Sequence, residues 1–229
     1  MPFYSATNAA DIFAIISNAA LLAPSLVAWN RGYIDISVLF FFEAWMSGIF
    51  HLCKAFDVCV MGFWTLHQFD FFFATSFIWL AATFLIILDD YIIWNHHLVG
   101  RHIELALRMS GLFIVAILQA MTSSDAKISF FSFAALGLLL IYLIAFRLVK
   151  HHWPPYDMYY LCLAFEMFAL SSTMFLVQNY WPGAYWIIHS DWHVLAAFAW
   201  TCLLMARGNE ELQPKTMRYI YPVARIKGN

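Results

Sequence analysis

The chain is dominated by apolar runs of about 20 residues, separated by short segments that carry charges, proline or glycine. A helix needs roughly 20 apolar residues to cross the hydrocarbon core of a bilayer. Of the 229 residues, 63% are hydrophobic and only 11% are charged, whereas a soluble domain has about 25% charged residues. The runs predict seven membrane-spanning helices, over about 9–29, 33–53, 65–88, 102–121, 128–149, 158–178 and 184–206.

The predicted fold class is an all-α membrane protein, because these runs lack the alternation of a β-barrel and backbone polar groups in lipid must be satisfied within a helix. We expect a seven-transmembrane helix bundle that forms one domain over residues 1–229, with a short basic tail at 207–229. The fourth run is the weakest of the seven, since Glu104 and Arg108 lie in its first half.

The distribution of lysine and arginine predicts how the bundle is oriented. With the N-terminus outside, ten of the twelve fall on the inner side, and only Lys54 and Lys127 lie outside. Because basic residues favour the cytosolic side, we expect the N-terminus outside or luminal and the C-terminus in the cytosol. The plasma membrane is the expected location, with the Golgi or endoplasmic reticulum as alternatives. The net charge of −2 implies no basic surface for nucleic acid.

Ionisable and polar side chains inside these runs are functional candidates, because they are costly in lipid. The candidates are Glu43, Ser47 and His51 in the second run, Asp70 in the third, and His189 and His193 in the seventh. Residues four apart share one helix face. In the predicted topology, all but Glu43 lie within about two turns of the outer face. We therefore expect three helices to bring them together beneath the outer leaflet.

Three histidines from two helices match the ligand set of a catalytic zinc site, in which water takes the fourth position. We predict that His51, His189 and His193 bind Zn²⁺, which lowers the pKa of bound water to about 7. Asp70 would orient a ligand or act as a base toward that water. Ser47 would donate a hydrogen bond to a substrate oxygen.

Simpler interpretations of the same residues stay open. Histidines in membrane helices also serve as hydrogen-bond partners between helices, so a polar packing cluster is the alternative to a metal site. Glu43 is either a protonated packing residue or a partner that supports a metal ligand. His67, at the outer end of the third run, fits either interpretation. Cys53 and Cys59 fall in the first outer loop, where oxidation is allowed, and their positions permit a disulfide.

The placement of Ser47, His51, Asp70, His189 and His193 on the second, third and seventh spans resembles the CREST superfamily. This superfamily includes the alkaline ceramidases, the adiponectin-type receptors and the transmembrane protein 8 family with its myomaker branch. The resemblance implies a seven-helix fold in which the three histidines bind zinc, with the serine and the aspartate nearby.

The local sequence is most similar to the transmembrane protein 8 family and its myomaker branch. The similar segments are Phe50-His51-Leu52-Cys53, Leu88-Asp89-Asp90, and His189-Ser190 followed by Trp192 just before His193. This resemblance implies a plasma-membrane protein that promotes cell–cell fusion, such as myoblast fusion, by binding or remodelling outer-leaflet lipid. A co-fusogen is the protein partner it allows, and the small and aromatic faces of the spans permit a homodimer without selecting one.

Two other functions fit the same residues. One is a zinc-dependent lipid hydrolase that cleaves an amide or ester, as a ceramidase or phospholipase does, which a lipidomic assay would detect. The other is a heptahelical signalling receptor, which the short loops and the short tail disfavour and which nucleotide exchange on a co-expressed G protein would reveal.

Overall fold

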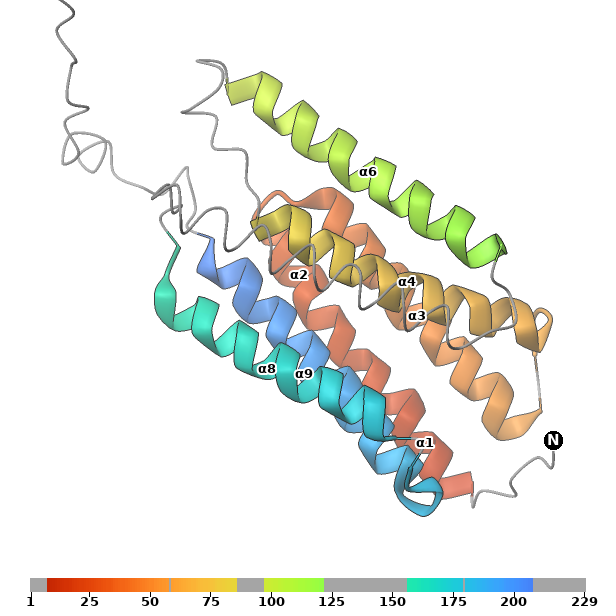
Figure 1. Cartoon of the computed structure of the whole chain (residues 1–229). Coiled ribbons are helices and arrows are strands. Elements are labelled where there is room, and N and C mark those ends of the chain that lie inside the picture. The colour runs from red at the N-terminus through yellow and green to blue at the C-terminus, as the bar shows by residue number, and fades with distance from the viewer. Residues whose placement is uncertain (1–7, 58, 86–96, 122–155, 179, 208–229) are drawn as a thin grey trace, which may run out of the picture.

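The computed structural model describes residues 8–57, 59–85, 97–121, 156–178 and 180–207, and nearly all of them are helical (Figure 1). The elements, in chain order, are α1 (Asn8–Ser17), the 3-10 turn η1 (Asn18–Leu21), α2 (Leu22–Asn30), α3 (Ile34–Phe56), α4 (Phe63–Leu85), α6 (His97–Met121), α8 (Met158–Val177), the 3-10 turn η2 (Pro182–Ala184) and α9 (Tyr185–Ala206). The described residues form no strand beyond one isolated bridge between Tyr156 and Arg207.

Five of these helical segments are long and apolar enough to cross a membrane: Ile12–Asn30, Ile34–Phe56, Phe63–Leu85, Met158–Val177 and Tyr185–Ala206. The protein is therefore an all-α, multi-pass membrane protein. Helix α6 contains a shorter apolar stretch, Leu105–Ile117. The predicted fifth span, 128–149, the end of the predicted third span and all but the first residue of the predicted tail lie outside the described residues.

The first span is not one continuous helix, although the hydropathy pattern predicts one over 9–29. The Ser17 hydroxyl and the Asn18 side-chain amide both donate to the Ala14 carbonyl, at 2.9 and 2.8 Å. Pro24 has no N–H to donate to the carbonyl one turn earlier. Side-chain bonds to the backbone and a missing backbone donor both loosen the regular α-helical ladder, which accounts for the 3-10 turn between α1 and α2.

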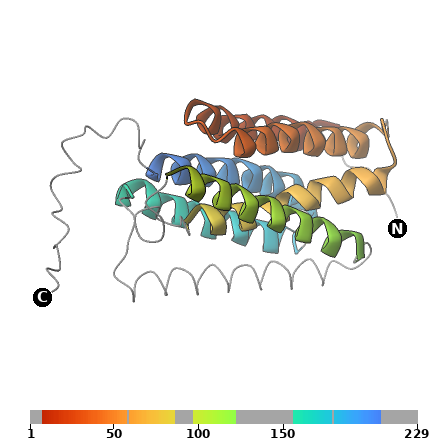
Figure 2. The same ribbon diagram turned by 90° about the horizontal axis from the view of Figure 1, so that it is seen from above.

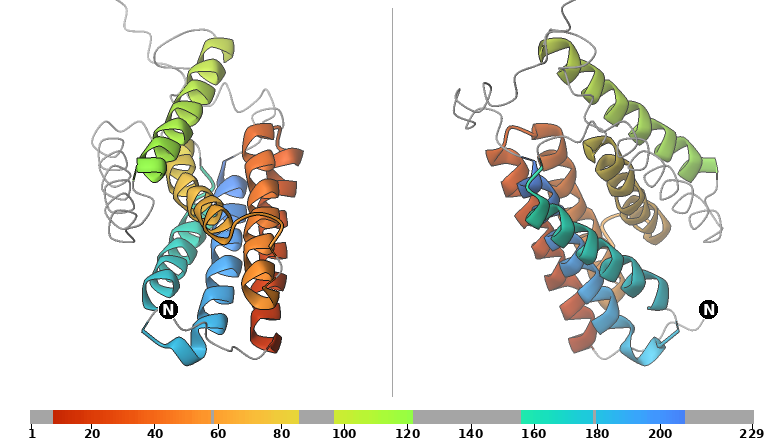
Figure 3. Two further views of the ribbon diagram at one scale, coloured as in Figure 1. Left: turned by 90° about the vertical axis from the view of Figure 1, so that its right-hand side faces the viewer. Right: turned by 60° about the vertical axis from the view of Figure 1, so that its left-hand side comes forward.

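The helices pack in a regular succession around the bundle. Helix α6 packs on α4, and α4 packs on α3. Helix α3 packs on α1 and α2, which both pack on α9, and α9 packs on α8. Figure 1 shows α6 at the edge of this arrangement, and Figures 2 and 3 show α9 between α8 and the α1–α2 pair. Helix α3 runs antiparallel to α4 and α9, so the end of α3 lies at the same end of the bundle as the beginnings of α4 and α9. We call this the site end.

An aromatic cluster fills the half of the bundle away from the site end. Phe40 of α3 stacks on Phe77 of α4 with ring centroids 4.0 Å apart. Trp200 of α9 meets Phe40 edge-on at 5.2 Å and Phe77 at 6.0 Å. All three side chains are buried. Burial of rings of this size dominates the packing energy of a core, so this half holds α3, α4 and α9 together and leaves the site end to polar residues.

The contact between α4 and α6 depends on Gly111. A Cβ atom at position 111 would overlap the indole ring of Trp79, whose Nε1 donates to the Leu107 carbonyl at 3.1 Å. We expect Gly111→Ala to lower the free energy of unfolding by about 1–3 kcal/mol, as overpacking does, and a thermal melt of the detergent-purified protein would measure it. Gly48→Ala is the matched control, because a Cβ there meets no atom within 4 Å. Equal melting temperatures for the two variants would contradict this packing.

Candidate metal centre

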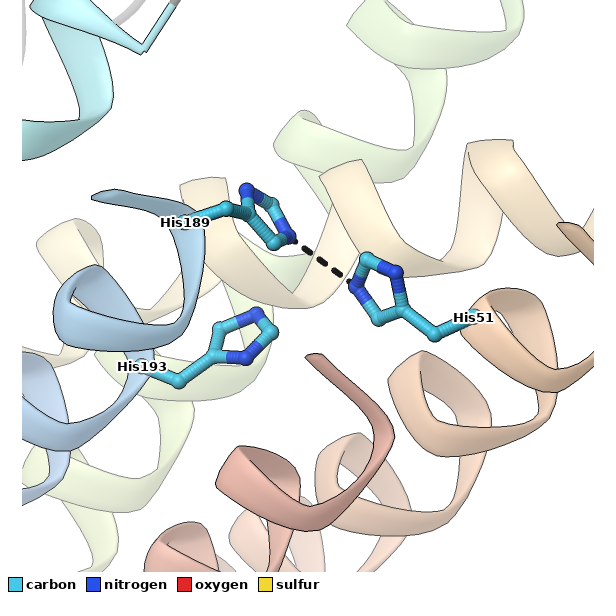
Figure 4. A group of neighbouring side chains, drawn as sticks. All are labelled: His51, His189 and His193. Atoms are coloured by element: carbon cyan, nitrogen blue, oxygen red, sulfur yellow. Dashed lines mark hydrogen bonds between the residues drawn. The ribbon is translucent and has the colours of Figure 1, made fainter. Parts of the chain in front are cut away.

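Three histidines from two helices meet at the site end. His51 lies near the end of α3, and His189 and His193 lie one turn apart near the start of α9. One ring nitrogen from each lies within 4.8 Å of the other two, and the three imidazoles point toward one another (Figure 4). Each side chain is at most 4% exposed. The structure thus brings together all three residues that the spacing predicts as ligands.

The donor set and its spacing fit a zinc ion. The Nε2 atoms of His51 and His189 are 3.0 Å apart, close to the separation of about 3.3 Å between two nitrogens bound to one tetrahedral zinc. His193 Nε2 is buried and forms no hydrogen bond within the described part of the chain. A buried polar atom without a partner is costly, and a metal ion would satisfy it.

Two residues that the sequence does not single out contact the Nδ1 atoms of the two α9 histidines. Gln178 Oε1, at the end of α8, lies 2.6 Å from His189 Nδ1. Ser17 Oγ, at the end of α1, lies 2.9 Å from His193 Nδ1. Both residues are polar and lie at the same depth in the predicted membrane as the histidines. Selecting the polar residues at that depth in every predicted span would therefore have included them.

Ser47 and Asp70 lie beside each other next to the histidine cluster. Ser47 is one turn before His51 on the same face of α3, and both Ser47 and Asp70 are buried. The Asp70 carboxyl and the Ser47 hydroxyl interact electrostatically. Within the described residues, however, neither Ser47 Oγ nor Asp70 Oδ1 completes a hydrogen bond. Asp70 is not part of the metal-ligand group, so the structure places it beside the serine as a neighbour of that group.

Glu43 lies two turns before His51 on α3 and is 2% exposed. Its carboxyl interacts electrostatically with Asp70, and its Oε2 has no hydrogen-bond partner among the described residues. No hydrogen bond in that part of the chain joins Glu43 to a histidine. One role predicted for Glu43 is to support a metal ligand. The described residues show no contact through which Glu43 would do so.

His67 and the two cysteines lie around the cluster. The His67 ring packs against Phe71 at 4.7 Å and Phe50 at 5.3 Å, and it is not part of the metal-ligand group. Cys53 and Cys59 are joined in a disulfide, which the sequence permits. This bond closes the connection between α3 and α4, directly after His51, and so restrains the end of α3 that carries the ligand.

An aromatic side chain of α9 and a basic side chain of α3 lie beside His189. The ring of Tyr185 stacks on the imidazole of His189, with centroids 5.1 Å apart and planes inclined by 15°. Lys54 Nζ lies 4.2 Å from the centroid of the Tyr185 ring, a cation–π contact. These contacts shield one side of the cluster and place a positive charge near it.

The described structure defines a class: a multi-pass helical membrane protein with a buried cluster of three histidines at one end of its bundle. The chain belongs to the family described as Protein of unknown function (DUF3522), whose family model matches residues 7–194. The matched range includes every residue of the cluster and its neighbours, from Ser17 to His193. A search of curated proteins finds no significant match to the chain.

Proposed function

We propose that this protein is a zinc-dependent hydrolase that cleaves an amide or ester bond of a membrane lipid. The observation that carries the proposal is the buried set of three imidazoles, in which His193 Nε2 lacks a hydrogen-bond partner among the described residues. The resemblance to the CREST superfamily supports the same function, because its alkaline ceramidases are lipid amidases. A three-histidine set is typical of catalytic rather than closed structural zinc sites.

His51, His189 and His193 would bind the zinc ion through ring nitrogens. When bound, zinc supplies a Lewis acid and lowers the pKa of a coordinated water to about 7. A fourth ligand from the chain is absent from the described residues, since the metal-ligand group contains the three histidines alone. That leaves a coordination position for water or for a substrate oxygen.

Ser47 and Asp70 would perform the remaining chemistry. The Ser47 hydroxyl, which completes no hydrogen bond of its own in the described structure, would donate to the carbonyl oxygen of the lipid as negative charge develops there. Asp70 Oδ1 would accept a proton from the nucleophilic water and deliver it to the leaving amine or alcohol. Both atoms are buried in the same bundle half as the histidines, where water is scarce and such interactions are strong.

The proposed topology has seven spans, with the site end outside the cytosol and the C-terminus inside it. Arg31, Arg108 and Arg207 lie at the opposite end of the described bundle, where Arg31 donates to the Leu204 carbonyl at 2.9 Å and Arg108 pairs with Asp35 at 2.7 Å. Basic residues favour the cytosolic side, and a disulfide at the site end fits an oxidising compartment. The substrate would then enter from the outer leaflet of the plasma membrane.

Cell–cell fusion is the second candidate function, supported by the similarity to the myomaker branch. Phe50 and Cys53, from one segment of that similarity, form a small core with Leu66 directly beside His51. Fusion would use the same outer-leaflet pocket to bind or remodel lipid, alone, as a homodimer or with a co-fusogen. The geometry favours hydrolysis over fusion, because hydrolysis uses a buried metal centre beside the Ser47 and Asp70 oxygens, and fusion requires no such centre.

The test is lipid turnover by zinc-loaded protein in vesicles that contain a ceramide and a phosphatidylcholine. We expect the wild type and His67→Ala to release free fatty acid, and His189→Ala to release only the background amount, as measured by mass spectrometry. His67 is the matched control, because it is a nearby histidine outside the metal-ligand group.

Absence of turnover by the zinc-loaded wild type would disprove the hydrolytic proposal for these two lipid classes. A cell-mixing assay with the same variants would then decide the second candidate. Fusion that persists with His189→Ala would show that fusion does not depend on the histidine cluster.

A further inference from the structure

The two histidines of α9 are each held through Nδ1 by a side chain from a different helix. Gln178 Oε1 of α8 contacts His189 Nδ1 at 2.6 Å, and Ser17 Oγ of α1 contacts His193 Nδ1 at 2.9 Å. Gln178 is 6% exposed and Ser17 is 9% exposed, so water competes little for either bond. The two imidazoles are therefore restrained from opposite sides of α9.

The chemistry of each partner decides which histidine nitrogen carries the proton. An amide oxygen can only accept, so His189 must donate through Nδ1–H. The Ser17 hydroxyl hydrogen is already donated to the Ala14 carbonyl at 2.9 Å, so Ser17 Oγ accepts from His193 Nδ1–H. A neutral imidazole with its proton on Nδ1 has its lone pair on Nε2.

Both Nε2 lone pairs are then directed at the space between the three imidazoles. His189 Nε2 lies 3.0 Å from His51 Nε2, and His193 Nε2 is the buried nitrogen that has no hydrogen-bond partner among the described residues. An imidazole ring rotates readily about its last side-chain bond, so without the Nδ1 partners each ring could turn its lone pair away from the cluster.

We propose that Ser17 and Gln178 are positioning residues that hold His193 and His189 with their Nε2 lone pairs directed at a shared zinc ion. This inference rests on the zinc centre of the proposed function and adds two residues to it. Hydrogen bonds to the second nitrogen of metal-bound histidines fix the tautomer and the ring orientation, and their loss lowers metal affinity by about 10–100-fold.

The test is the zinc affinity of the full-length protein in detergent, measured by competition with a chelator. Gln178→Leu and Ser17→Ala are each expected to weaken zinc binding by about 10–100-fold. Gln178→Glu should bind zinc at least as tightly as the wild type, because a carboxylate accepts the same Nδ1–H bond. Ser171→Ala is the control, since Ser171 is a buried serine of α8 that bonds the Trp192 carbonyl rather than an imidazole.

A second readout separates positioning from a general loss of packing. With saturating Co²⁺ in place of zinc, the visible absorption band reports the ligand geometry. We expect this band to shift in Gln178→Leu and Ser17→Ala and to stay unchanged in Ser171→Ala. Lower thermal stability by itself would change none of these spectra.

The outcomes distinguish the two proposals. Wild-type protein that binds zinc, together with unchanged affinity and spectra in Gln178→Leu and Ser17→Ala, would overturn the positioning role and leave the zinc centre standing. Wild-type protein that binds no zinc would overturn both. If Gln178→Leu and Ser17→Ala do not fold, the zinc affinity of Gln178→Glu decides. Zinc binding by Gln178→Glu that is tenfold weaker than binding by the Ser171→Ala control would contradict the inferred hydrogen bond.

Discussion

Replacement of His189 and His193 together by alanine is expected to abolish zinc binding by the purified protein. The wild type should retain about one zinc per chain, since three histidines and one water complete a tetrahedral site. In the double variant a single imidazole, His51, would remain of the ligand group, and one neutral ligand does not retain zinc through purification. Mass spectrometry of the metal content measures the difference directly.

The double variant should remain folded, because the aromatic cluster of Phe40, Phe77 and Trp200 lies in the other half of the bundle. Its elution as a single species in size-exclusion chromatography would show this. His67→Ala, which removes a histidine packed among phenylalanine rings, should keep its zinc. A folded wild type without metal would reduce the cluster to hydrogen-bonded packing between helices, the alternative that the sequence leaves open.

Asp70→Asn is expected to lower the rate of lipid hydrolysis by about 10²–10⁴-fold, the usual effect of removing a general base. Asparagine keeps the size of the buried side chain but cannot accept and return a proton. Zinc content should be unchanged, since Asp70 lies beside Ser47 and is not part of the metal-ligand group. Fatty acid release and metal content, measured on the same preparation, separate the two effects.

Asp191→Asn is the matched control for this variant. Asp191 lies between the two histidines in the sequence, but its side chain is exposed and belongs to another face of α9. We expect it to hydrolyse lipid at the wild-type rate. An Asp70→Asn variant that retains zinc and full activity would assign the base to another group and leave Asp70 a packing role beside Ser47 and Glu43.

The helices were predictable because hydropathy and helical periodicity are local properties. Apart from the end of the third, which lies outside the described residues, the ends of the five membrane-spanning segments lie within three residues of the predicted ones. The spacing of four between Ser47 and His51, and between His189 and His193, places each pair on one helix face without any knowledge of the neighbours. The inner-side bias of lysine and arginine then predicts the level at which the pairs lie.

Other features depend on contacts between helices that no local pattern encodes. Gln178 and Ser17 become partners of the α9 histidines only because α8 and α1 pack against α9. Gly111 matters only because the Trp79 ring of another helix occupies the space beside it. Each depends on how two helices are rotated and displaced along each other.

The sequence by itself determined that the chain crosses a membrane as helices and which of its polar residues share a face and a depth, because the cost of polar groups in lipid depends on residue type and spacing. Only the tertiary structure decided that three histidines converge, that Gln178 and Ser17 hold two of them, and that no hydrogen bond among the described residues joins Glu43 to them. The directions of lone pairs and hydrogen bonds are set by the packing of helices from distant parts of the chain.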